Sequence, residues 1–279
     1  MTMHTRWRYT VNDVMLTLTG ACAFVTIATL FFILGYLVLN GWQSVDLAFF
    51  TQLPKPPGEA GGGMANAIAG SAVMVGLASL IGIPIGFLAG IYLAEYEGGT
   101  FAFIVRYSAD LLNGIPSIVL GIVAWSLIVR PMKSFSAWSG AIALSLILIP
   151  IVARSTEQFL RAVPNSLREG ALALGANKAT TITTVVVPAA SRGILTGIIL
   201  GVARISGETA PLLFTSLGNE FWGKSLSQPT ASLPAAIFTH AISPYDDWHR
   251  QAWAAGLVLL TVVLLANIAA RLVVARGKA

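Results

Sequence analysis

One stretch decides the fold: Arg168-Glu169-Gly170-Ala171-Leu172-Ala173-Leu174-Gly175, with Pro188 thirteen residues beyond its last glycine. The stretch is half polar, yet it lies between two long apolar segments. Gly175 is suited to the left-handed residue that ends many helices, and Asn177 is suited to cap the turn that follows. The sequence therefore predicts a short, well-delimited helical element at the edge of an apolar body.

Two capping-box spacings support this prediction. Ser155-Thr156-Glu157-Gln158 and Ser166-Leu167-Arg168-Glu169 both have the pattern in which the first and last side chains satisfy free backbone N–H groups at a helix start. Pro164 separates the two short helices that these boxes predict. An amphipathic linker beside the membrane is the alternative interpretation, because helix caps occur everywhere.

The composition places the chain in a membrane. Of its 279 residues, 56% are hydrophobic and 10% are charged, and the mean hydropathy is +0.77. Because a soluble domain carries about 25% charged residues, we expect an all-α integral membrane protein. The single cysteine, Cys22, cannot form an internal disulfide, and the three histidines lack ligand spacing. We therefore expect no metal site, no cofactor and no catalytic residues.

Six apolar segments are predicted to cross the membrane as helices. They lie at about 15–39, 65–93, 111–129, 140–153, 193–214 and 252–272. In the third segment, Pro116 is expected to bend the helix and Asp110 to cap its start. Asn113 is expected to satisfy backbone groups that Pro116 frees, with a role in the substrate pathway as the weaker alternative. The fourth segment is close to the minimum length for a span.

Two of these segments carry a small residue at every fourth position. The stripes consist of Gly82, Gly86 and Gly90 in the second segment and of Gly193, Gly197 and Gly201 in the fifth. Small residues let helix backbones approach closely in lipid, so both stripes are predicted to be packing faces.

The distribution of Lys and Arg predicts the orientation, because positively charged loops stay on the inner side of the membrane. With the N-terminus inside, eleven of the seventeen basic residues fall in inner segments and five in outer loops. The stretch around Glu169 is then cytoplasmic, and so are both termini. Arg130 and Lys133, in a short outer loop, form a local exception.

Arg204 and Glu208 form the acid–base pair that lies deep in an apolar segment, spaced i and i+4. At ~100° per residue they share a narrow helix sector with the glycine stripe of the fifth segment. Gly207 and Pro211 are expected to break the helix here. Two interpretations remain open. The pair either locks helices together, or it forms an anion site in which the guanidinium meets phosphate or sulfate oxygens and the carboxylate balances it between turnovers.

The stretch of the first paragraph resembles the EAA loop of bacterial ABC-importer permeases. That pattern is Glu-Ala-Ala, three residues, Gly, nine residues, then Ile-x-Leu-Pro. Glu169, Ala171, Gly175 and Pro188 hold their places in it, while Gly170 replaces the middle Ala and valines replace the Ile and the Leu. The resemblance implies that these five residues belong to a cytoplasmic coupling helix that fits a groove on an ATPase subunit.

The resemblance extends beyond this loop: most of residues 50–272 is similar to the PstA-type permease family of the bacterial phosphate ABC importer. The most specific run is Arg204-Ile205-Ser206-Gly207-Glu208-Thr209-Ala210-Pro211, and Ala89-Gly90-Ile91-Tyr92-Leu93-Ala94-Glu95-Tyr96 supports it. The resemblance implies an ABC importer type I permease fold and a multi-pass translocation subunit of the inner membrane. Its implied partners are a PstC-type second permease, two copies of a PstB-type ATP-binding subunit and a periplasmic PstS-type phosphate-binding protein, with no nucleic acid.

The organisation expected from this family has four parts. They are a cytoplasmic N-terminus at 1–13, an anchor helix with a periplasmic loop at 14–64, a permease domain at 65–272 with a coupling loop at 154–192, and a cytoplasmic tail at 273–279.

Three alternatives differ from this function. A secondary transporter of an oxyanion fits two glycine-striped segments in a three-plus-three repeat, but it does not need a coupling loop. An ABC permease for sulfate or molybdate is the near neighbour, because arginine suits any oxyanion. A membrane enzyme lacks support, since the sequence shows no nucleophile–base set, metal cluster or nucleotide loop.

Overall fold

The computed structural model describes residues 3–59, 61–96 and 98–276. Its elements in chain order are α1 (Met3–Gly41), η1 (Trp42–Ser44), α2 (Leu47–Thr51), α3 (Ala65–Glu95), α4 (Thr100–Gly114), α5 (Ser117–Ala124), η2 (Trp125–Val129), α6 (Arg130–Met132), α7 (Ala137–Arg161), α8 (Asn165–Ala173), α9 (Lys178–Thr181), η3 (Ile182–Val186), α10 (Val187–Ser206), α11 (Ala210–Thr215), α12 (Leu233–Ala241) and α13 (Asp246–Arg276). The predicted all-α fold is confirmed: within those ranges the chain forms helices, with only isolated β-bridges.

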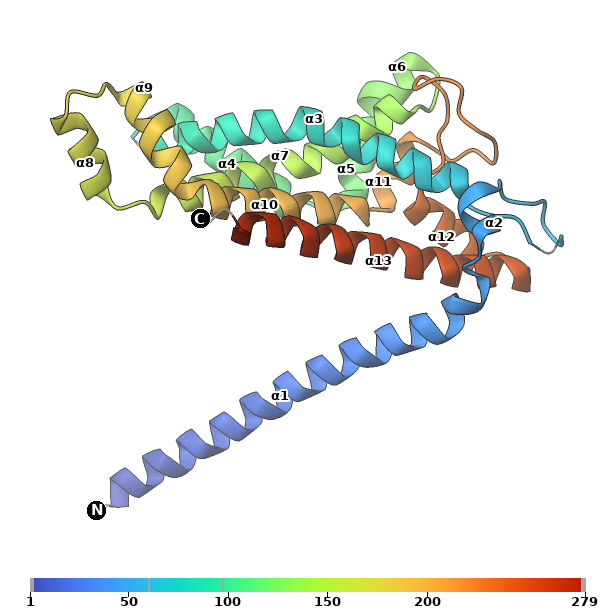
Figure 1. Ribbon diagram of the computed structural model, residues 1–279, viewed down its shortest axis with the longest axis horizontal. Helices are drawn as coiled ribbons and strands as arrows, with labels where there is room; N and C mark the ends of the chain where they lie inside the picture. The colour runs from blue at the N-terminus through green and yellow to red at the C-terminus, as the bar shows by residue number, and fades with distance from the viewer. Residues whose placement is uncertain (1–2, 60, 97, 277–279) are drawn as a thin grey trace.

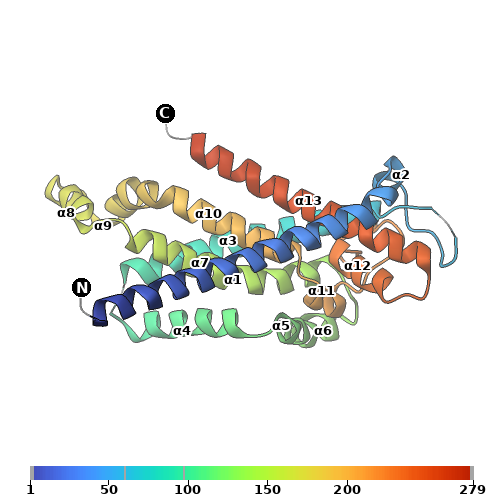
Figure 2. The ribbon, with the colours of Figure 1, turned by 90° about the horizontal axis from the view of Figure 1, so that it is seen from below.

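The long helices α3, α7, α10 and α13 lie alongside one another and form the body of the molecule (Figures 1 and 2). The short helices α8 and α9 project from one end of this body. The other end carries α2, α12 and the loops around them. The two ends that the sequence assigned to opposite sides of the membrane are therefore well separated.

Within the described ranges, five helical stretches are long and apolar enough to cross a membrane, and a bent pair brings the number to as many as six. The five are Trp7–Ser44, Ala65–Glu95, Ala137–Arg161, Lys178–Ser206 and Asp246–Leu272. The bent pair consists of Thr100–Gly114 and Ser117–Met132, which meet at 108°. This number agrees with the six predicted segments when the pair counts as one span.

The predicted third span at 111–129 is wrong in its placement. The chain is not a single helix there, because Ile115 is extended (φ −73°, ψ 133°) and precedes Pro116, a position at which proline disfavours the helical conformation. The α4 helix begins at Thr100, well before the apolar run. Asp110 therefore lies inside α4 and does not cap a helix start, which corrects that prediction.

The predicted fourth span at 140–153 is too short. The α7 helix runs for 25 residues, from a capping box between Ser136 and Ser139 to Arg161. Its polar last turns make ion pairs, so they stay helical although they lie outside the apolar window. The short helix predicted to start at Ser155 does not exist, because Ser155 is inside α7.

Both glycine stripes pack against α7, which is the central helix of the body. A Cβ atom added to Gly86 would lie 2.7 Å from the carbonyl oxygen of Ile149, and one added to Gly90 would lie 2.6 Å from that of Ala153. On the other side, a Cβ atom at Gly197 would lie 1.6 Å from the hydroxyl of Ser155. The stripes are thus packing faces, as predicted, and α7 separates α3 from α10 along much of their length.

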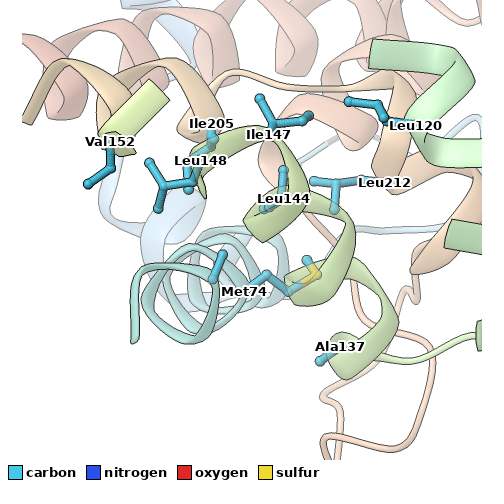
Figure 3. Close-up of a cluster of buried hydrophobic side chains, with 10 residues drawn as sticks. Met74, Leu120, Ala137, Leu144, Ile147, Leu148, Val152, Ile205 and Leu212 are labelled. Carbon is cyan, nitrogen blue, oxygen red and sulfur yellow. The ribbon is translucent and has the colours of Figure 1, made fainter. Parts of the chain in front are cut away.

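A cluster of buried apolar side chains fills the region where these helices meet (Figure 3). Met74 of α3, Leu144 and Leu148 of α7, and Ile205 of α10 are all almost completely buried. Because lipid tails are as apolar as leucine, this close packing stabilises the body through dispersion contacts more than through loss of water.

The α1 helix diverges from the body (Figure 1). It contacts α13 only near its C-terminal end, where the rings of Tyr36 and Trp253 lie 5.3 Å apart and a Cβ atom at Gly41 would be 2.8 Å from the Trp253 carbonyl. The structure confirms a long apolar helix at the predicted first segment, but that helix contributes little to the core.

Candidate functional site

The stretch that contains Glu169 forms α8 and the loop to α9. Helix α8 begins at Asn165 with Pro164 at its N-cap position, and no side chain caps it. The capping box predicted from Ser166 to Glu169 is therefore wrong, because Ser166 already lies inside the first turn. Glu169, Gly170 and Gly175 are exposed, as a docking surface requires.

The end of α8 is built as predicted. Gly175 has a φ of +86°, and its N–H donates to the carbonyl of Leu172 at 2.9 Å. The N–H of Ala176 donates to the carbonyl of Ala171 at 3.1 Å, which completes the paired bonds of a Schellman stop. Asn177 then caps α9, because its Oδ1 accepts from the N–H of Thr180 at 2.8 Å.

Pro188 lies inside a continuous helical span that begins at Lys178. Proline has no N–H to give to the preceding turn, and the π-helical segment η3 comes immediately before it. Pro188 therefore belongs to the membrane-proximal part of the fifth span, whereas Glu169, Gly170, Ala171 and Gly175 belong to the projecting element.

A cluster of charged side chains at the same end of the body was missed by sequence reasoning. Its centre is Glu157 of α7, which is buried and lies within ion-pair distance of three arginines. Arg106 of α4 approaches at 2.8 Å, Arg161 approaches at 3.1 Å, and Arg154 is also paired with it. Arg154 additionally meets Asp110 of α4 at 2.9 Å.

The charged residues at these ends of α4 and α7 stabilise one another through this cluster. A buried carboxylate is stable only when it is paired and hydrogen-bonded, and here the guanidinium groups supply both. The signal in the sequence was the i, i+3 and i+4 spacing of Arg154, Glu157 and Arg161 directly after an apolar run. Glu157 was instead interpreted as part of a capping box.

Arg204 and Glu208 lie at the break between α10 and α11. The predicted break is confirmed: α10 ends at Ser206, and Gly207 has non-helical angles. The Nε of Arg204 is 3.7 Å from Oε1 of Glu208, so the predicted pair forms. The expectation that both charges share the packing face of one helix is wrong, because Glu208 is beyond the helix end and the Arg204 side chain is 53% exposed.

An exposed arginine whose carboxylate partner is 16% exposed can exchange that partner for a dissolved anion. Asn113 does not join this pair. It lies exposed at the end of α4 and, within the described residues, its side chain makes no hydrogen bond, so its expected role at Pro116 is not observed. The described residues also contain no group of three or more His, Cys, Asp or Glu side chains suited to a metal ion.

A pocket of about 270 Å³ lies at the opposite end of the body, beside α12. Its wall includes His240, whose ring lies 4.3 Å from that of Trp248. The Nδ1 atom of His240 is 2.9 Å from the carbonyl of Ala236; since a carbonyl only accepts, Nδ1 carries the proton. Burial lowers the pKa of His240 below its usual 6.5.

Known proteins similar to this chain point to one family. The family model described as "Binding-protein-dependent transport system inner membrane component" matches residues 82–278. The "Phosphate transport system permease protein PstA" of Yersinia pestis is 47% identical over 98% of this chain and 92% of its own length. The protein of the same name from Haemophilus influenzae is 46% identical over 95% of this chain and 94% of its own length.

A more distant relative and the solved structures agree with this. The "Probable phosphate transport system permease protein PstA" of Methanocaldococcus jannaschii is 36% identical over 94% of this chain and 92% of its own length. A chain of the inward-facing MetNI methionine ABC transporter aligns with a TM-score of 0.64, 18% identity, and coverage of 76% of this chain and 95% of that one. A chain of a bacterial alginate ABC transporter aligns with a TM-score of 0.67, 15% identity and 95% coverage of both. At such identities the structures show the fold alone.

Proposed function

Because the chain belongs to the family of binding-protein-dependent transport system inner membrane components, we propose that it is the permease subunit of an ATP-driven importer that carries inorganic phosphate across the inner membrane. The observation that carries this proposal is 47% identity to a phosphate permease over 98% of the chain. The subunit is a translocation component, and a partner hydrolyses the ATP.

The Arg204–Glu208 pair supports an oxyanion as the substrate. A guanidinium offers a planar fork that matches phosphate oxygens and stays charged at every physiological pH. Its contact with Glu208, at 3.7 Å, is long for an ion pair, so an arriving anion meets little competition for the exposed face of Arg204. Glu208 then balances the charge of Arg204 while the site is empty.

The projecting element supports a partner ATPase. Glu169 and Gly175 are exposed at the tip of the molecule, and the side chain of Leu174 is 91% exposed. An apolar side chain held out beside a rigid Schellman stop suits a groove on another protein. We assign this tip to docking of a PstB-type ATP-binding subunit, and Pro188 lies inside the adjoining span, which begins at Lys178.

The remaining assembly follows from the family. We assign a PstC-type second permease and two copies of the ATP-binding subunit to the complex, with a periplasmic PstS-type phosphate-binding protein on the outer side. The excess of Lys and Arg in the inner segments supports an orientation with both termini in the cytoplasm.

Uptake by the reconstituted complex tests the proposal. Proteoliposomes that contain this chain, its partner permease and the ATPase should accumulate radiolabelled phosphate when ATP and the binding protein are supplied. Import without ATP would favour a secondary transporter, and preferential import of sulfate or molybdate would reassign the substrate.

The same assay separates the two interpretations of the ion pair. The double variant Arg204→Gln/Glu208→Gln removes both charges together, so a purely structural pair should be replaced without loss of uptake. An anion site predicts that uptake is abolished while the complex still assembles. Arg204→Lys should also be impaired, because an ammonium group lacks the bidentate fork. Phosphate uptake by the double variant at the parental rate would end the anion assignment.

A further inference from the structure

The C-terminal end of α3 is surrounded by basic side chains from the neighbouring elements. The carbonyl oxygen of Leu93 accepts from Arg106 of α4 at 3.3 Å and from Arg161 of α7 at 3.2 Å. The carbonyl oxygen of Glu95 accepts from Lys178 of α9 at 2.9 Å. Cations at a helix C-terminus satisfy free carbonyl groups and complement the helix dipole, so this end of α3 is held in place from three directions.

The side chain of Glu95 receives the fourth cation. Its carboxylate pairs with Arg168 of α8, and the exposed fractions of the two side chains are only 7% and 19%. Arg168 also donates to the carbonyl of Leu160 at 2.8 Å, so it connects α8 to both α3 and α7. Because a buried charge that loses its partner is costly, Glu95 and Arg168 should move together when either element moves.

The Glu95–Arg168 pair connects α3 to the proposed docking element, because Arg168 belongs to α8. Arg168 directly precedes Glu169 and lies about two turns before the Schellman stop at Gly175, so it stands at the base of the proposed docking element. Lys178 holds the other side of the same element, with its ammonium group 4.0 Å above the ring of Tyr96. The docking element is therefore attached to α3 on both sides of its exposed tip.

The α3 helix can carry a displacement onward. Its glycine stripe lies against the backbone of α7, where Gly86 and Gly90 leave no space for even a methyl group. Packed helices of this kind move as rigid neighbours, because the interior deforms little under load. A push on the C-terminal end of α3 therefore reaches the centre of the body.

We propose that Glu95, held by Arg168, is the positioning residue through which movement of the docking element enters the membrane-spanning helices. This inference rests on the proposed function as the permease of an ATP-driven importer. It adds to that function a route: the ATPase displaces α8, the Glu95–Arg168 pair transfers the displacement to α3, and α3 transfers it to α7.

The test measures coupling in the complete complex reconstituted in proteoliposomes, as phosphate imported per ATP hydrolysed. Glu95→Gln and Arg168→Gln should still bind the ATPase and hydrolyse ATP, but the ratio should fall about tenfold, within the usual range for coupling between sites. Arg168→Lys keeps the charge and should recover part of the ratio. The matched control is Asp247→Asn/Arg250→Gln, which removes a more exposed ion pair of 4.0 Å at the other end of the body and should leave the ratio unchanged.

The results of this assay distinguish failure of the proposed route from failure of the proposed function. A parental ratio in Glu95→Gln overturns the inference, and so does a loss of ATPase association that accounts for all of the lost uptake. If Glu95→Gln fails to reach the membrane, Lys178→Gln and Arg168→Lys provide the decision, since Lys178 is a surface residue: lowered ratios support the route, and parental ratios in both overturn it. Failure of the parental chain to bind an ATPase would refute the proposed function instead.

Discussion

At the scale of single residues, the docking element depends on the backbone conformation of Gly175. Gly175→Val places a β-branched residue at a φ of +86°, which costs about 1–2 kcal/mol or more and disturbs the Schellman stop. Phosphate uptake should fall, while the amount of protein in the membrane stays near parental because the residue contacts no part of the body.

Gly170 provides the control for that prediction. It lies inside α8 with open space around it, so Gly170→Ala should favour the helix by about 1 kcal/mol and leave uptake intact. Normal uptake and normal ATPase association in Gly175→Val would show that the shape of this stop does not matter for docking.

The burial of His240 predicts that the folding stability depends on pH. Burial lowers its pKa below 6.5, so the unfolded chain binds more protons than the folded chain once the pH drops under that value. Folding stability should therefore decrease as the pH falls from about 6.5 towards the lowered pKa. Thermal unfolding of the detergent-solubilised protein at pH 7.5 and pH 5.5 should show a larger downward shift in the parental chain than in His240→Gln, which cannot titrate. Equal shifts in both would contradict this assignment.

At the scale of elements, the contact between α3 and α7 depends on the glycine stripe. A Cβ atom at Gly86 would lie 2.7 Å from a backbone oxygen and 2.8 Å from the Cβ of Val152, so neither neighbour can simply rotate away. Gly86→Ala should destabilise the protein by about 1–3 kcal/mol, the usual range for overpacking. The thermal midpoint of the purified protein measures this effect.

The same helix contains a matched control. Gly76 has no neighbouring atom within 4 Å of the position of an added Cβ, so Gly76→Ala should leave the thermal midpoint near or slightly above the parental value. Because alanine is the better helix former at both positions, destabilisation of the same size by both substitutions would show that overpacking against α7 is not the cause of the loss at Gly86.

These elements also show what the sequence could predict. A glycine at every fourth position of an apolar segment has a well-defined use in lipid, so both packing faces were predicted correctly. The sequence could not show that they share α7 as a partner, because α7 has no glycine stripe of its own. Similarly, Gly175 and Asn177 act within one turn of the chain, and their roles followed from local rules.

Long-range contacts account for the predictions that were wrong. The first half of the bent pair was missed because Arg106 and Asp110 make α4 look too polar for a membrane helix. The structure stabilises these charges with Glu157 and Arg154, which are about fifty residues away in the sequence. A pattern of single residues cannot reveal such pairing. The start of α4 and the charged cluster around Glu157 could therefore be found only from the structure.

At the scale of the whole molecule, the charged cluster, the docking element and the end of α3 lie together at one end of the body. The loops around α2 and α12 lie at the other end (Figure 1). The pocket that His240 lines is beside α12 at that end. The positive-inside rule predicts that the end with the docking element is cytoplasmic, and this orientation stays a prediction. An importer that is driven from the cytoplasm requires this arrangement, because the ATPase and the binding protein approach from opposite sides.

Single-cysteine labelling tests that orientation. In a Cys22→Ser background, a cysteine in place of Glu59 lies on an exposed outer loop, and a cysteine in place of Asn177 lies at the exposed start of α9. An impermeant thiol reagent added outside intact cells should label position 59 and should label position 177 only after the membrane is opened. Because both sites are exposed, burial cannot explain a difference between them. Labelling of position 177 in intact cells would reverse the topology and remove the cytoplasmic docking element with it.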